Sequence, residues 1–99
     1  MNSKSKSVVL DRFDYKGFEI TENLNTKFNS TYYSIADLRN TYTNEDGEKK
    51  NPHCHAGNKH LAKQIVDCFC QIKYMGYSRA KPKIKDQALR LMNYEVKIG

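Results

Sequence analysis

The sequence predicts an α+β domain, in which a small antiparallel sheet of three or four strands is followed by two helices packed on one of its faces. Apolar residues alternate with polar ones in short segments of the first half of the chain, and they follow helical spacing in two segments of the second half. The chain has 99 residues, of which 38% are hydrophobic and 28% are charged, the composition of one folded domain. We expect residues 1–7 to be a flexible tail and residues 8–99 to be that domain.

Two strands joined by a tight turn are predicted at the start of the domain. Residues 8–15 are rich in apolar side chains and predict the first strand, and residues 18–20 begin the second. Gly17 lies between them and supplies the positive φ that such a turn needs. Residues 23–31 contain many polar turn-forming side chains, so we expect a loop here, anchored to the core by Leu24 and Phe28.

The next part of the chain predicts the rest of the sheet. Residues 32–42 are rich in β-forming side chains and predict a third strand. Residues 43–52 predict an exposed turn with Asp46 and Gly47 at its tip, and residues 53–55 a short returning strand.

Two helices are predicted in the second half. The first covers residues 58–75 and is bounded by Gly57 and Gly76. The second begins at Pro82, a residue favoured in the first helical turn, and ends at residue 93. Apolar residues then alternate over 94–98, which indicates a closing strand or an extended tail. The apolar residues of the first helix that share one arc are Leu61, Ala62, Ile65, Cys68, Phe69 and Ile72.

The net charge of +6 is carried entirely by the carboxyl-terminal part of the chain. Residues 1–57 contain eight Lys or Arg and eight Asp or Glu, whereas residues 58–99 contain nine basic and three acidic residues. This asymmetry indicates an anionic partner, which is a nucleic acid, an acidic protein or a lipid headgroup.

The candidate binding residues are basic and aromatic side chains centred on the segment between the two helices. Lysine and arginine neutralise phosphates, and tyrosine rings stack on unpaired bases, so the combination suits direct nucleic-acid binding. A surface that only keeps the protein soluble is the alternative explanation. The candidate residues are Lys73, Tyr74, Tyr77, Arg79, Lys81, Lys83, Lys85 and Arg90.

All histidines and cysteines lie between residues 53 and 70, but their spacing argues against a metal site. Cys68 and Cys70 point to different sides of the predicted helix, because they are only two residues apart. His60 and Cys68 are about 12 Å apart along the helix axis, too far to share a zinc ion. We therefore expect no metal and no other cofactor, and the remaining possible ligands are His53, His55 and His60.

The segment His53-Cys54-His55 resembles the His-hydrophobe-His core of the rolling-circle replication and relaxase endonucleases. That resemblance implies a divalent ion on the two histidines, Tyr74 or Tyr77 as the nucleophile, and Lys81 as an assisting cation. A metal-dependent endonuclease is thus a remote alternative. Other catalytic signatures are missing, and we expect a protein that is not an enzyme.

In its size, its richness in Asn, Tyr and Lys, and its basic balance, the chain resembles the small early proteins of temperate phages. Some of those proteins bind and modify host machinery, including the RecBCD recombination nuclease. The resemblance implies a non-enzymatic accessory protein that binds a host complex acting on DNA. An odd number of cysteines and the lack of a membrane-spanning segment predict a cytoplasmic protein that does not bind membranes. The sequence leaves the oligomeric state open, and a dimer is compatible with it.

Overall fold

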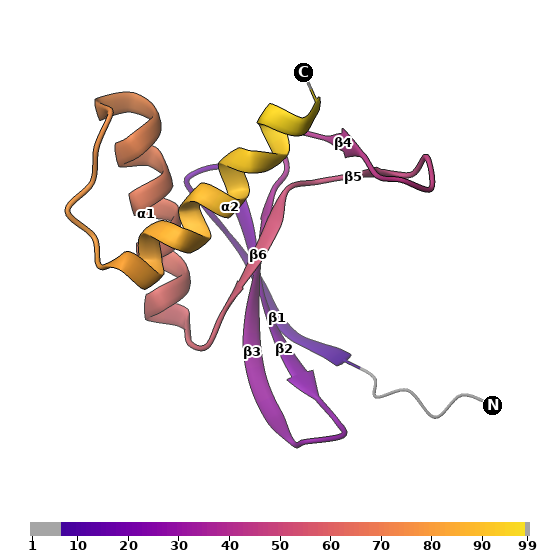
Figure 1. Ribbon diagram of the computed structural model, residues 1–99. Coiled ribbons are helices and arrows are strands. Elements are labelled where there is room, and N and C mark those ends of the chain that lie inside the picture. Colours follow the sequence, from indigo (N-terminus) through magenta and orange to yellow (C-terminus); the bar gives the residue numbers. More distant parts are fainter. Residues whose placement is uncertain (1–6, 99) are drawn as a thin grey trace.

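The computed structural model describes the backbone of residues 7–98 and the side chains as far as Met92. A four-stranded antiparallel sheet is followed by two helices that cover one of its faces, which confirms the predicted α+β class (Figure 1). Strand order in the sheet is β1-β2-β3-β6, and β4 and β5 pair separately as a short ribbon. The elements are β1 (Ser7–Tyr15), β2 (Phe18–Asn25), β3 (Ser30–Asp37), β4 (Tyr42–Thr43), β5 (Lys49–Lys50), β6 (His53–Ala56), α1 (Lys59–Met75) and α2 (Pro82–Ile98).

The turn between β1 and β2 has the predicted tight geometry. Lys16 and Gly17 both have positive φ values, 51° and 88°, and Tyr15 pairs with Phe18 across the turn. A two-residue turn in which both residues have positive φ values matches the right-handed twist of the strands in a hairpin. Ser7 pairs with Asn25 and belongs to β1, so the predicted tail ends one residue earlier than expected, and residues 1–6 lie outside the described part of the chain.

The predicted loop over residues 23–31 is wrong, because most of this segment is paired strand. β2 continues to Asn25, and only residues 26–29 turn, with the Asn25 side chain accepting hydrogen bonds from the backbone N–H groups of Lys27 and Phe28. Polar strand residues are tolerated because one face of the sheet carries no helix; Asn23 there donates to Ser34. Phe28 is 68% exposed and does not anchor the turn.

The third strand ends at Asp37, five residues before its predicted end. The Asp37 carboxylate is buried and accepts hydrogen bonds from the backbone and side chain of Arg39 and from the Asn40 side chain. These bonds turn the chain out of the sheet. Tyr42 instead begins the β4–β5 ribbon, where Gly47 occupies the predicted tip with a φ of 83°.

Both helices begin where the sequence predicts. α1 starts after Asn58, whose side-chain oxygen accepts from the Leu61 N–H at 2.7 Å, and it ends at Gly76, which has a φ of 83°. α2 starts at Pro82 but runs to Ile98, so the expected closing strand over 94–98 is wrong. Extending an existing helix gains one hydrogen bond for each residue ordered, without a new nucleation step. Within residues 7–98, neither helix has the length and apolar character of a membrane span.

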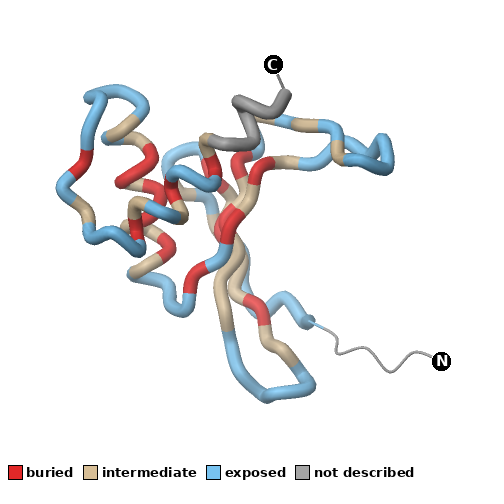
Figure 2. The backbone as a smooth tube through the Cα atoms, in the orientation of Figure 1, coloured by how far each residue is buried: buried red, intermediate tan, exposed pale blue. Residues whose placement is uncertain are grey.

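The core lies between the sheet and the two helices (Figure 2). Its centre is the contact between Phe18 of β2 and Phe69 of α1, whose rings meet edge to face with centroids 5.1 Å apart. Other residues buried in this layer are Ile20, Ile35, Cys54 and Ala56 from the sheet, Ala62, Ile65, Val66 and Cys68 from α1, and Ile84, Ala88 and Leu91 from α2.

Replacement of Phe69 by alanine should lower the free energy of unfolding by about 3–5 kcal/mol, because the side chain is fully enclosed and leaves a cavity. Phe28→Ala is the matched control, and it should change the same quantity by less than about 0.5 kcal/mol because Phe28 is exposed. Urea denaturation followed by circular dichroism measures both. Equal losses in the two variants would contradict the placement of the core.

Candidate binding groove between the two helices

The segment between the helices is fixed to α1 by Ser78. This residue is buried, and its hydroxyl donates to the Gln71 side chain at 2.6 Å and accepts from the Ala80 N–H at 3.1 Å. At the start of the segment, the Gly76 N–H donates to the Ile72 carbonyl oxygen at 3.0 Å. The segment therefore runs back along α1 in a defined path before α2 begins.

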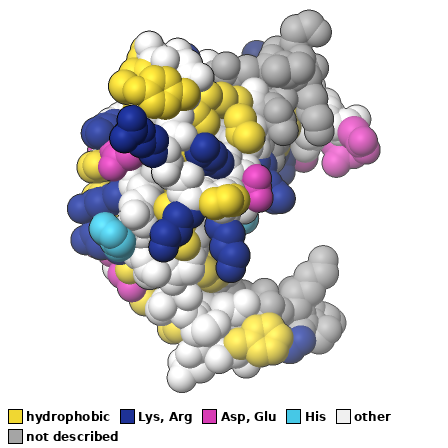
Figure 3. Space-filling view, turned by 60° about the vertical axis from the view of Figure 1, so that its left-hand side comes forward, with side chains coloured by type: hydrophobic (Ala, Val, Ile, Leu, Met, Phe, Trp, Pro, Cys, Tyr) yellow, Lys and Arg dark blue, Asp and Glu magenta, His cyan; other side chains and the backbone are white. Residues whose placement is uncertain are grey.

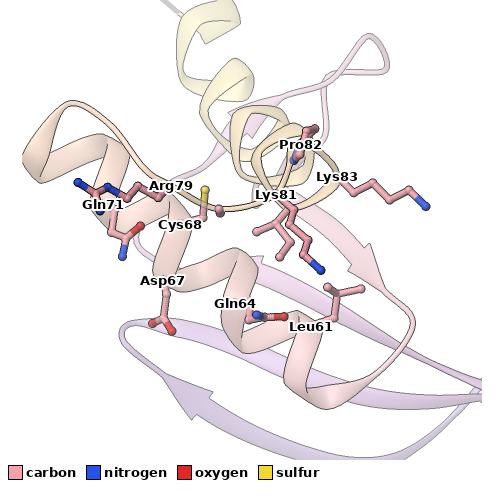
Figure 4. A pocket seen from close by; sticks show the side chains of 11 residues that line it. Leu61, Gln64, Asp67, Cys68, Gln71, Arg79, Lys81, Pro82 and Lys83 are labelled. Carbon is pink, nitrogen blue, oxygen red and sulfur yellow. The ribbon is translucent and has the colours of Figure 1, made fainter.

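An open groove of about 950 Å³ lies between α1, this segment and the start of α2 (Figure 4). Its size is at the upper end of the range typical of ligand sites. The floor is apolar: Cys68 and Ile84 are buried there, and Leu61 and Ala80 are half-buried. The side chains along its rim are Gln64, Asp67, Gln71, Arg79, Lys81 and Lys83.

Two of the predicted cations flank the groove. In Figure 4 the Arg79 side chain extends along α1 past Gln71, whereas the Lys81 side chain points towards Leu61. The positive charges thus stand towards opposite ends of the apolar floor. The ammonium group of Lys83 points away from the groove, although the residue lines it.

Asp67 is the carboxylate on the rim, and its charge is compensated locally. Its Oδ1 atom lies 2.6 Å from Lys16 Nζ and accepts a hydrogen bond from the Tyr15 hydroxyl at 3.0 Å. The hydrogen bond to Asp67 raises the pKa of Lys16, and it is also the main reason that the pKa of Tyr15 is raised. Because this carboxylate is already paired with Lys16, it does not offset the positive charges of Arg79 and Lys81.

Two lysines that sequence reasoning did not include extend the basic surface on the other side of α1. Lys59 Nζ lies 4.7 Å from the centre of the Phe13 ring, and Lys63 Nζ lies 5.6 Å from the centre of the Tyr15 ring. Their spacing of four residues places them on one face of α1, which the sequence could have indicated. Lys and Arg side chains are spread over this helical side of the molecule (Figure 3).

The structure does not bring all the predicted binding residues together. Tyr74 lies in the last turns of α1 and lines a smaller hollow with Lys16 and Cys70, while Lys73 is 5.5 Å from the Phe69 ring centre. Tyr77 is 57% exposed and lies outside the groove lining, and Lys85 is half-buried on α2. 

Arg90 also lies outside the groove lining, and it is close enough to β6 for its charge to act on Cys54 and His55. Burial is the stronger influence on Cys54 and raises its pKa to about 12. The basic set proposed from sequence therefore divides into Arg79 and Lys81, which flank the groove, Lys83, which lines it with its ammonium group pointing away, and the outlying Lys73, Lys85 and Arg90.

The histidines do not meet the candidate tyrosines. His53 and His55 project from the sheet face opposite the helices, with ring centres 6.0 Å apart, and the ring that His55 meets on the neighbouring strand is Tyr32. His60 is exposed in the first turn of α1. Cys70 lies inside α1 and not at its boundary. Among the residues described with side chains, no three His, Cys, Asp or Glu are grouped to hold a metal ion.

Comparison with known proteins adds no relative: no protein-family model, no curated protein and no solved structure matches the chain.

The His55 side chain should make the protein less stable in mild acid. Its pKa is lowered by desolvation and by the nearby His53 and Arg90, so the unfolded chain takes up a proton at a pH where the folded chain does not. This contribution to stability is complete above the ordinary histidine pKa, and it is lost as the pH falls from that value through the lowered pKa of the folded protein. In His55→Gln, the free energy of unfolding should fall less between pH 7.5 and 5.5 than in the wild type.

Denaturant titrations at these pH values measure the difference, with a comparison at pH 8 to correct for any effect of the substitution on packing. Parallel curves for the two proteins at every pH would contradict the assignment.

Proposed function

We propose that this chain is a non-enzymatic accessory protein of the phage type, which binds a host protein complex acting on DNA and modulates that complex. The observation that carries the proposal is the apolar-floored groove with Arg79 and Lys81 on its rim. A surface of this kind suits an acidic protein segment, and enzymes that act on nucleic acids commonly expose acidic rims beside basic channels.

The character of the groove favours a protein partner over a nucleic acid. The described residues that line it contribute aliphatic and thiol groups to its floor and no aromatic ring. Proteins that bind single strands use exposed aromatic rings on which bases stack, beside the cations that hold the backbone. Here the exposed Tyr74 and Tyr77 lie outside the groove that the two cations flank.

Direct nucleic-acid binding is the second candidate. Tyr74 and Tyr77 are 68% and 57% exposed near the end of α1, and Lys73 lies in the same turns. These side chains would form a small stacking surface with a cation beside it.

A cytoplasmic location, the host cytoplasm if the protein is phage-encoded, is part of the proposal. The free thiols of Cys54, Cys68 and Cys70 support a reducing compartment.

A binding assay with a purified host recombination nuclease, RecBCD first, tests the proposal. We expect the chain to bind the complex and to change its nuclease rate. The double variant Arg79→Ala/Lys81→Ala should raise the Kd about tenfold, which corresponds to about 0.7 kcal/mol for each exposed charge. Lys49→Ala/Lys50→Ala removes the same charge from β5 and should leave the Kd within about twofold.

Labelled single- and double-stranded DNA are titrated at two salt concentrations in parallel. Tight DNA binding that weakens steeply with salt, together with no binding to the nuclease, would contradict the proposal and support the second candidate.

A further inference from the structure

We infer that the groove between α1 and the start of α2 receives an acidic peptide segment of the partner, with one apolar side chain seated on the floor and carboxylates beside Arg79 and Lys81. This inference rests on the proposed function for the existence of a protein partner, and it identifies the chemistry of the segment that is bound.

The floor is suited to an apolar side chain because its deepest residues are packed in the core and its outer residues are only partly buried. Ile84 is 6% exposed and Cys68 is 1% exposed, so both are held by the core, while Leu61 and Ala80 remain half-buried at the groove surface. A side chain that covers these groups removes further apolar surface from water without rearranging the core. Since Ser78 ties the segment to Gln71, little ordering is required when a ligand binds.

The charge around the floor is unbalanced in favour of an anion. α2 begins without an acidic side chain in its first turn, and Lys81 precedes that turn with its side chain directed into the groove, while the ammonium group of Lys83 points away. A cation near the amino-terminal end of a helix is repelled by the positive end of the helix dipole, and a carboxylate that binds there reduces this repulsion. Asp67 does not supply this relief, because it is occupied by Lys16 and Tyr15.

Two other occupants fit the groove less well. A nucleic-acid backbone would place phosphates beside the cations, but the aliphatic floor offers no ring on which a base could stack. A second copy of this chain would have to present an acidic segment with an apolar side chain. Its exposed acidic hairpin, Glu45-Asp46-Gly47-Glu48, has none between its carboxylates, and the exposed Leu10 and Asp11 lie in the paired strand β1 with Arg12 directly after them.

Fluorescence anisotropy with a labelled peptide tests the inference on the full chain. The probe is a short peptide in which one leucine is flanked by glutamates, compared with a peptide in which serine replaces the leucine. We expect the leucine peptide to bind at least tenfold more tightly. Arg79→Ala and Lys81→Ala should each weaken its binding about threefold, and Leu61→Gln should remove most of the advantage of leucine over serine.

The control is Lys49→Ala/Lys50→Ala, which lowers the net charge on β5 and should leave peptide binding within about twofold. Circular dichroism and the unfolding midpoint verify that Leu61→Gln is folded, and the two charge variants test the groove independently of that substitution.

In the peptide, DNA and self-association measurements, four results would overturn the inference. These are equal binding of the two peptides, an equal effect of the control variant, tighter binding of single-stranded DNA that is lost in the Arg79 and Lys81 variants, or self-association abolished by those variants. Failure of the proposed function is distinguishable. If RecBCD binds the chain but neither groove variant changes the Kd, the inference about the groove is wrong and the proposed function stands. If the leucine peptide binds but no host nuclease does, the inference about the groove stands and the proposed function is wrong.

Discussion

The packing of Phe69 on Phe18 is the contact on which the rest of the molecule depends. It holds α1 against the sheet with an edge-to-face ring contact at 5.1 Å, and such pairs stabilise beyond the area that they bury by about 0.5–1.5 kcal/mol. Because one side of α1 packs on the sheet through this contact, the adjoining side of α1 faces α2 and the segment between the helices. The apolar residues left there, Cys68 and Leu61, become the floor of the groove.

Local signals in the sequence predicted those elements whose boundaries are set by single residues. Gly17 and Gly76 adopt the positive φ that their positions require, and Asn58 and Pro82 begin the two helices. The errors arose where strand pairing or a buried side chain decides the structure. Residues 23–25 are strand because they pair with the start of β3, which leaves only residues 26–29 as the turn, and the end of β3 depends on the local hydrogen bonds of the buried Asp37 carboxylate.

The candidate site could be predicted only in part, for a related reason. Net charge by sequence position identified Arg79 and Lys81, but it could not separate them from Arg90, which the turns of α2 carry towards β6. Net charge by sequence position also could not identify Lys16 as part of the site, because Lys16 contacts Asp67, which is 51 residues away in the sequence. Periodicity assigned both Leu61 and Cys68 to the core, but only Cys68 is buried, and the half-buried Leu61 forms part of the groove surface.

We expect Ser78 to hold the segment between the helices in one conformation, so that the groove exists before any partner binds. Amide hydrogen exchange at Ala80, whose N–H donates to the Ser78 hydroxyl, measures this most directly. We expect the Ala80 amide hydrogen to exchange slowly in the free protein and faster in the Ser78→Ala variant. Exchange in the wild type at the rate of an unstructured peptide would contradict it.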